Sequence, residues 1–213
     1  MLHRRRPHLV PGFAAAMAAA LSLAATNPAP RVRFADVTAA SGITFVNATG
    51  NPDRKDYIFE VKGGGVAALD YDDDGWIDLA FSRGSSLERW REGRNPGPGL
   101  YRNRGDGTFE DVTLKAGLTR GGWGVGVSAA DYDNDGHVDL YLTNLGPDVL
   151  YHNNGDGTFT DVTDRAGIRA PGWSSSAAFG DFDRDGFLDL YVASYLDVGP
   201  DKLPEGRAGG TCA

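Results

Sequence analysis

The sequence has a single cysteine, Cys212, among its 213 residues. One thiol cannot form a disulfide within the chain, so a small disulfide-stapled domain is excluded. Methionine is also scarce, with two residues, whereas glycine is abundant, with 30. This composition favours a turn-rich β protein.

Basic residues are too few for a nucleic-acid binder. The chain has 21 Lys and Arg against 29 Asp and Glu, a formal net charge of −8. Without Arg4, Arg5 and Arg6, which lie in the first 25 residues, 18 basic residues face 29 acidic ones. Nucleic-acid backbones are bound by patches of Lys and Arg. We therefore expect a protein or glycan ligand and no nucleic acid.

Long apolar runs are almost absent, and the one present, from about Val10 to Ala25, is too short to span a bilayer comfortably. It follows a basic head and ends in small residues, a pattern typical of a signal peptide over 1–25 that is cleaved after Ala24 or Ala25. An uncleaved N-terminal anchor is the alternative. Cleavage predicts a secreted, periplasmic or cell-surface protein with no membrane span.

Three copies of one acidic motif are the dominant feature of the chain. The motif reads D-aromatic-D-x-D-G-x-apolar-D-L, and its copies begin at Asp70, Asp131 and Asp181. Carboxylates stand at positions one, three, five and nine, and glycine at position six permits a sharp turn. Four carboxylates in nine residues repel one another unless a cation lies among them. Ca²⁺ takes six to eight oxygens at about 2.3–2.6 Å, which such a loop can supply.

The sequence therefore predicts one Ca²⁺ in each acidic loop, three in total. The side chains at positions one, three, five and nine and the main-chain carbonyl at position seven are the predicted ligands. They are Asp70, Asp72, Asp74, Trp76, Asp78, Asp131, Asp133, Asp135, His137, Asp139, Asp181, Asp183, Asp185, Phe187 and Asp189.

The acidic loops do not follow the pattern of an EF-hand. An EF-hand loop ends with glutamate at position twelve and lies between helices. Position twelve is Phe81, Leu142 or Val192 here, and the flanking residues alternate with period two, which indicates strands. The loops are expected to join strands.

A second motif follows the first and gives the repeat its length. Residues 100–113 match residues 150–163 at an offset of 50, and each copy contains an Asp-Gly turn between alternating apolar residues, which predicts a hairpin. One repeat is then four short antiparallel strands, the size of a propeller blade. The first repeat carries an insertion within 82–99, predicted to be an exposed loop.

These repeats predict an all-β fold, a partial β-propeller of four-stranded antiparallel blades with about two and a half blades present. A two-sheet sandwich is the alternative. Residues 33–43 are similar to a fourth strand with its following turn, so a strand before the first blade is expected. The predicted segments are a signal peptide (1–25), a leading strand (26–48), a linker (49–65), blade 1 (66–118), blade 2 (119–168), a partial blade 3 (169–196) and a truncated tail (197–213).

The two motifs resemble FG-GAP/VCBS repeats, the blades of the integrin α-subunit propeller. The opening F-A-D-V-T-A-A-S-G-I-T-F resembles the start of proteins in the ASPIC/UnbV, cartilage acidic protein-like group. The resemblance implies a seven-bladed parent propeller with calcium on the hairpins between first and second strands, in secreted or surface proteins. A ring needs four to eight blades, so we expect this chain to be an N-terminal fragment.

No catalytic constellation is visible in the sequence, so we predict a binding, adhesion or scaffold module and no enzyme. The propeller body of a polysaccharide hydrolase or lyase, with its catalytic residues beyond residue 213, is the alternative. His137 and His152 have no second histidine or cysteine nearby in the sequence, so no transition-metal site is expected. Trp123 and Trp173 are expected to pack at the blade rim.

Overall fold

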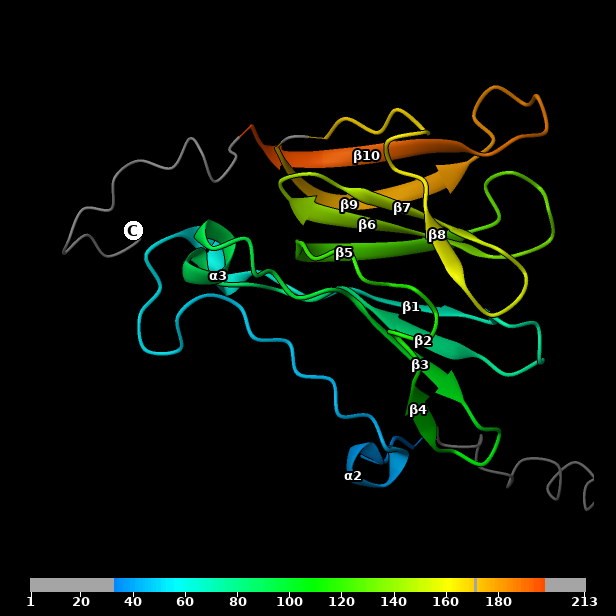
Figure 1. Ribbon diagram of the computed structural model, residues 1–213, viewed down its shortest axis with the longest axis horizontal. Helices are drawn as coiled ribbons and strands as arrows, with labels where there is room; N and C mark the ends of the chain where they lie inside the picture. The colour runs from blue at the N-terminus through cyan, green and yellow to red at the C-terminus, as the bar shows by residue number, and fades with distance from the viewer. Residues whose placement is uncertain (1–32, 171, 198–213) are drawn as a thin grey trace, which may run out of the picture. The chain divides into compact units, whose positions relative to one another are not determined.

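The computed structural model describes residues 33–170 and 172–197 (Figure 1). The described residues from Val37 onward belong to one compact unit, and every helix and strand below lies in it. The predicted signal peptide and nearly all of the predicted tail, including Cys212, lie outside the described residues. Within them the chain is almost entirely β, as predicted.

Four strands form blade 1 in the order β1-β2-β3-β4, all antiparallel. Their bounds are β1 Val66–Leu69, β2 Asp78–Phe81, β3 Gly99–Asn103 and β4 Phe109–Asp111. Blade 2 has the same order, with β5 Trp123–Ala130, β6 Asp139–Leu145, β7 Val149–Asn153 and β8 Phe159–Asp161. Blade 3 begins with β9 Trp173–Gly180 and β10 Asp189–Leu196.

The three blades stack face to face (Figure 1), and their first strands β1, β5 and β9 are neighbours. Close approach between them requires glycine, since a Cβ on Gly65 would lie 2.8 Å from the backbone of Gly126. Ser128 in β5 donates its hydroxyl to the carbonyl of Ala177 in β9 at 2.6 Å. A single bridge, Leu145 with Trp173, is the only strand pairing between blades 2 and 3 among the described residues.

Alternation along β6 divides the core into two layers. Leu140 and Leu142 pack in the cluster shared with blade 1, whereas Tyr141 packs in the cluster shared with blade 3. Because both faces of β6 meet a neighbouring blade, all seven of its residues are buried. The period-two pattern in the sequence thus reflects two buried faces.

The fourth strand of each complete blade follows a turn that the sequence specifies closely. In the β7–β8 hairpin, Asn154 N–H donates to the carbonyl of Thr158 at 2.9 Å, and Asp156 Oδ1 accepts from the amide and hydroxyl of Thr158. Gly155 and Gly157 have φ of 71° and 80°, the left-handed region that favours glycine. The β3–β4 hairpin has the same bonds.

The segment before β1 differs from the predicted leading strand. Residues 33–48 contain the one-turn helix α2 (Thr38–Ser41) and no strand. The turn at the end of residues 33–43 does resemble the turn after the fourth strand of blade 1, as predicted. Gly42 packs against the carbonyl of Phe109 as Gly117 packs against that of Phe159, with hypothetical Cβ distances of 2.8 and 2.9 Å.

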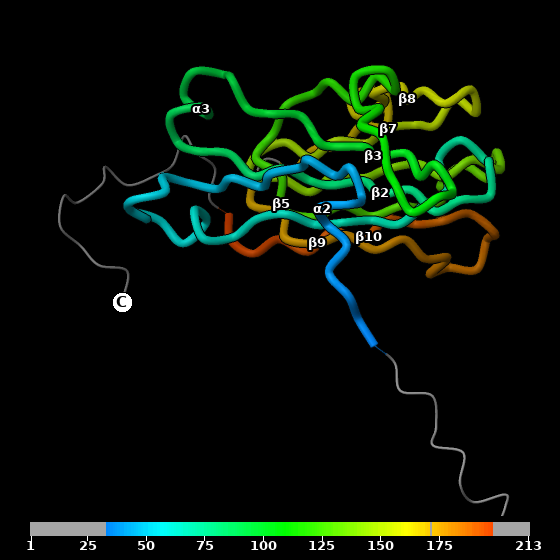
Figure 2. The backbone as a smooth tube through the Cα atoms, turned by 90° about the horizontal axis from the view of Figure 1, so that it is seen from below, coloured from blue at the N-terminus to red at the C-terminus, as the bar shows by residue number. Residues whose placement is uncertain are grey.

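The linker and the insertion both fold onto the blades. After α2 the chain runs back along blade 1 toward α3 (Leu87–Arg91), as Figure 2 shows. The linker contains the 3₁₀ helix η1 (Ile58–Val61), whose Phe59 packs against Trp123 and Trp173 with ring centroids 5.2 and 6.0 Å apart. Both tryptophans are buried, consistent with the expected packing role. The insertion forms α3 and is not simply an open loop.

Candidate metal sites

The three acidic loops join first to second strands, at the end of the blades opposite α3 (Figure 1). We refer to residues 70–78 as loop 1, 131–139 as loop 2 and 181–189 as loop 3. They connect β1 to β2, β5 to β6 and β9 to β10. This arrangement excludes the helix-flanked loop of an EF-hand.

The same hydrogen bonds curl each loop around its first aspartate. In loop 1, Asp70 Oδ1 accepts from the amide of Asp74 at 3.1 Å, and Oδ2 accepts from Gly75 at 2.9 Å. Loops 2 and 3 repeat both bonds. The position-six glycines adopt φ of 88°, 95° and 93°, so the turn that the sequence predicted is formed.

Position four of every loop is also left-handed, which the motif did not predict. Asp73, Asn134 and Arg184 have φ of 56°, 58° and 65°. Asp and Asn tolerate this region better than other side chains, and no described contact explains the arginine. Two of these side chains reach the next loop. Asp73 Oδ2 lies 2.7 Å from His137 Nδ1, and Asn134 donates to the carbonyl of Gly186 at 3.0 Å.

The aspartate at position nine ties strands together. Asp139 is fully buried and accepts from the amides of Tyr132 and Asn153, at 3.0 and 2.8 Å. Asp78 does the same in blade 1, with the amides of Tyr71 and Asn103. Burial raises the pKa of both carboxyl groups, and the amide hydrogen bonds only partly offset it. These two aspartates therefore connect the start of each loop to the third strand of its blade, whether or not an ion is bound. We call this set of hydrogen bonds the frame of the loop.

An asparagine on the third strand completes that frame. Asn153 donates its side-chain amide to the carbonyl of Val138 at 3.1 Å and to that of Tyr71 in blade 1 at 2.9 Å. Its Oδ1 accepts from the amide of Gly155 at 3.1 Å. Sequence reasoning gave Asn103 and Asn153 no role, although both stand in the repeated L-Y-x-N motif.

Three carboxylates converge in each loop, with ligand atoms within 4.8 Å of one another. The converging positions are one, three and nine in loops 1 and 3, but one, three and five in loop 2. The groups are Asp70, Asp72 and Asp78; Asp131, Asp133 and Asp135; and Asp181, Asp183 and Asp189.

The donor set fits a hard cation such as Ca²⁺, since it consists of carboxylate oxygens. In loop 1, Asp72 Oδ1 is buried and accepts no hydrogen bond from the described residues, so this oxygen is free to bind a cation. The predicted contributions of Asp74 and Asp185 are not part of the converging groups. Each instead accepts the amide of position seven at 2.9 Å.

The side chains at position seven of loops 1 and 2 lie against the turn between the third and fourth strands of their own blade. That their main-chain carbonyls bind a cation stays a prediction. A Cβ on Gly105 would lie 2.7 Å from Cε2 of Trp76, and one on Gly155 would lie 2.4 Å from Nε2 of His137. The glycine of each β3–β4 and β7–β8 turn is thus needed for the close approach of an aromatic ring.

A basic side chain on the third strand faces the acidic loop of its own blade. In blade 1, Arg102 Nε lies 2.6 Å from Asp72 Oδ2, and Nη2 lies 2.7 Å from Asp74 Oδ2. In blade 2, His152 holds the equivalent position. The sequence placed His152 on a strand without connecting it to the loop. Its position in the L-Y-x-N motif, shared with Arg102, was the available signal.

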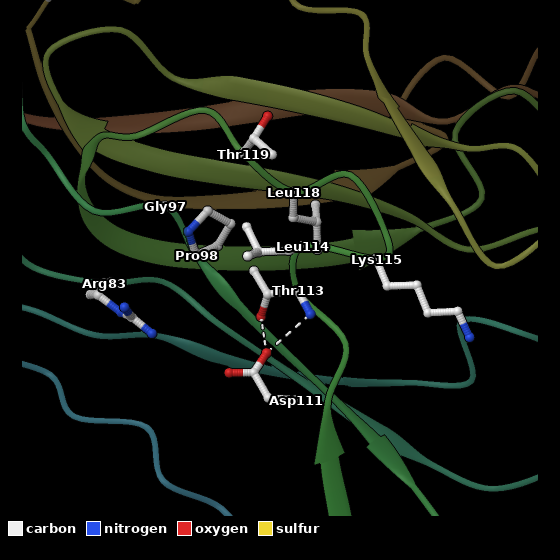
Figure 3. A pocket seen from close by; sticks show the side chains of 9 residues that line it. All are labelled: Arg83, Gly97, Pro98, Asp111, Thr113, Leu114, Lys115, Leu118 and Thr119. Carbon is white, nitrogen blue, oxygen red and sulfur yellow. Dashed lines mark hydrogen bonds between the residues drawn. The ribbon is translucent and has the colours of Figure 1, made fainter.

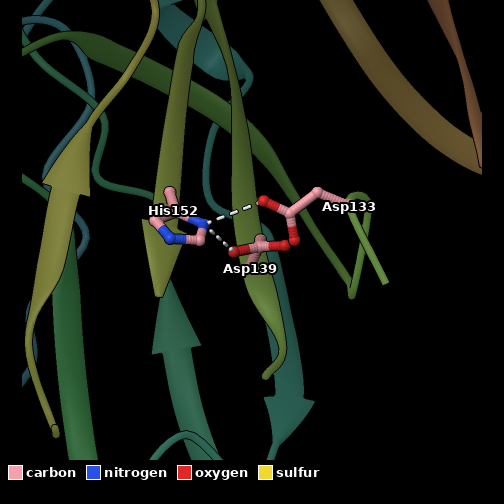
Figure 4. Close-up of side chains that lie close together, drawn as sticks. All are labelled: Asp133, Asp139 and His152. Atoms are coloured by element: carbon pink, nitrogen blue, oxygen red, sulfur yellow. Dashed lines mark ion pairs between the residues drawn. The ribbon is translucent and has the colours of Figure 1, made fainter. Parts of the chain in front are cut away.

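Figure 4 shows how His152 points between two carboxylates of loop 2. Nδ1 lies 3.3 Å from Asp133 Oδ2 and 3.3 Å from Asp139 Oδ1. Nε2 lies 3.8 Å from Asp135 Oδ2. The imidazole thus forms a converging group with Asp133 and Asp139.

A surface cavity of about 610 Å³ lies on blade 1 away from the acidic loops (Figure 3). Its lining includes Arg83, Asp111, Lys115 and Leu118. The Asp111 carboxylate already accepts from the amide and hydroxyl of Thr113, at 3.0 and 2.6 Å. The cavity brings together no set of metal-binding side chains.

The profile of the FG-GAP-like repeat matches residues 70–142 and again residues 131–192. The two matches begin on the first aspartates of loops 1 and 2 and together span more than half of the chain. The chain belongs to the FG-GAP-like repeat family. A search of curated proteins found no match. No helix in 33–170 and 172–197 is long and apolar enough to cross a membrane.

Proposed function

We propose that this FG-GAP-like repeat protein is an exported, calcium-stabilised binding module that engages a protein or glycan, and that it is not an enzyme. The observation that carries the proposal is the convergence of three carboxylates in each of three loops at one end of the blades. Family membership supports the propeller architecture, and β-propellers of this repeat type are suited to presenting a binding surface. The predicted leader supports export, where calcium is available.

Calcium would supply a positive charge that relieves repulsion among the carboxylates of each loop. The aspartates at positions one and three would hold it in all three loops, with position nine in loops 1 and 3 and position five in loop 2. Thirteen of the 29 acidic residues lie in these loops, so bound ions would also neutralise much of the excess charge.

The expected stabilisation is moderate for each ion. Extracellular calcium modules bind with Kd of about 10⁻⁴–10⁻³ M. At a tenfold excess of calcium over Kd, each site adds about 1.4 kcal/mol to the free energy of unfolding. Three sites would then contribute about 4 kcal/mol, a large part of the stability of a typical domain.

The test is the double variant Asp133→Ala with Asp135→Ala in the whole chain. We expect one calcium fewer by equilibrium dialysis and a smaller rise of Tm on adding calcium. The matched control is Glu110→Ala with Asp164→Ala, which removes two exposed acids outside the loops and should leave both quantities unchanged. Equal calcium binding by both double variants would remove the proposal.

A further inference from the structure

Arg102 and His152 occupy one structural position but have different chemistry toward a metal ion. Both lie on the third strand of a blade, one residue before the asparagine of the frame, and both face their own acidic loop. A guanidinium has five N–H donors and no lone pair, so it can only compete with a cation. A neutral imidazole has a lone pair on one ring nitrogen and is a common metal ligand.

The position of His152 Nδ1 matches that of a ligand. It lies 3.3 Å from one oxygen of Asp133 and 3.3 Å from one of Asp139. Two ligands of a tetrahedral zinc ion with bonds of about 2.1 Å stand about 3.4 Å apart. Nδ1 is buried and has no hydrogen-bond partner among the described residues. The three ligand atoms all lie within 4.8 Å of one another.

One carboxylate of this group is also held in place independently of an ion. Asp139 is fixed by two backbone amides. The other ring nitrogen, Nε2, lies 3.8 Å from Asp135 Oδ2. In the metal-bound state Nδ1 would use its lone pair, and the proton would be on Nε2, on the side of this carboxylate. Imidazole nitrogen with carboxylate oxygen suits a borderline transition metal, whereas Ca²⁺ favours oxygen alone.

We propose that His152 makes loop 2 a site for a divalent transition metal such as Zn²⁺, with Asp133 and Asp139 as the other ligands, and that Arg102 excludes such an ion from loop 1. This rests on the proposed function of the loops as cation sites. Asp133 belongs both to this group and to the all-oxygen group of loop 2. Zinc and calcium therefore compete for loop 2.

Exchanging the two residues tests the proposal. The whole chain is stripped with a chelator and titrated with Zn²⁺ by calorimetry, and with Co²⁺ to observe the d–d absorption of a nitrogen-ligated site. Relative to wild type, His152→Arg should weaken zinc binding at loop 2 by about 100-fold or more, beyond the loss typical of outer-shell partners. Arg102→His should add one zinc site, because Asp72 and Asp78 stand in loop 1 as Asp133 and Asp139 do in loop 2.

The control is Asp164→Asn, a change at an exposed acid outside the loops; zinc binding at loop 2 should persist. If His152 only forms ion pairs with Asp133 and Asp139, His152→Arg will bind zinc as wild type does and Arg102→His will gain no site. Either result overturns the inference. A wild-type chain that binds calcium but no zinc overturns only the inference of a zinc site. A chain that binds no calcium overturns the proposed function.

Discussion

Blades 1 and 2 share strand order and the hydrogen bonds that close their acidic loops, yet a different side chain faces each loop. The frame residues repeat, with a buried aspartate at position nine and an asparagine on the third strand. The residue beside that asparagine is Arg102 in one blade and His152 in the other. The repeated residues thus build the hairpin, while a varying one sets the chemistry around its carboxylates.

The largest expected effect concerns a residue of the frame. Asp139→Ala leaves two amides, of Tyr132 and Asn153, without acceptors in a buried place. We expect a loss of about 3 kcal/mol in the free energy of unfolding, measured with urea in the presence of a chelator. Asp189→Ala should lose about 1 kcal/mol, because Asp189 is exposed and accepts one described amide bond, from Phe182. Equal losses would contradict the role assigned to the frame.

A smaller difference is expected between the two frame asparagines. Asn153 donates to the carbonyl of Tyr71 in the neighbouring blade, at 2.9 Å, whereas Asn103 has no such bond among the described residues. Asn153→Ala should therefore be about 1 kcal/mol more destabilising than Asn103→Ala in urea unfolding. The reverse order would show that the contact between blades carries no free energy.

The sequence predicted the repeated architecture because each blade carries its own local signals. Alternating apolar residues specified the strands, and Gly155 and Gly157 specified the hairpin by the backbone that they permit. The acidic loops were placed between the correct strands for the same reason. The family match over 70–192 agrees with these assignments.

Contacts between residues distant in sequence were not predictable in this way. The burial of Phe59 depends on Trp123 and Trp173, which are more than sixty residues away. The approach of His152 to Asp133 depends on the pairing of strands β6 and β7, and the shared L-Y-x-N motif was the only sign of it in the sequence. The leading strand was expected from similarity alone, and residues 33–48 form no strand.

The smallest expected effect is a pH dependence due to a buried carboxyl group that has no counterpart in blade 1. Burial raises the pKa of the Asp148 carboxyl, whereas Pro98 stands at this position in blade 1. The folded state then binds the proton more tightly than the unfolded state. The stability due to this group is present below pH of about 4 and is lost as the pH rises through the folded pKa.

Replacing Asp148 with Asn removes this dependence. We expect the Tm of wild type relative to Asp148→Asn to fall between pH 4 and pH 7, measured with chelator present. Asp164→Asn, a change at an exposed acid, is the control and should show no such trend. A Tm difference that rises with pH would mean that the folded state holds the Asp148 proton less tightly than the unfolded state, contrary to the effect of burial.

Calcium titration of the whole chain, followed by calorimetry with Tm read at each concentration, tests the cation-site hypothesis most directly. We predict saturable binding with up to three ions per chain and a Tm that rises with calcium at millimolar concentrations. A flat titration with an unchanged Tm would contradict the hypothesis, and the converging carboxylates would then serve only to shape the turns.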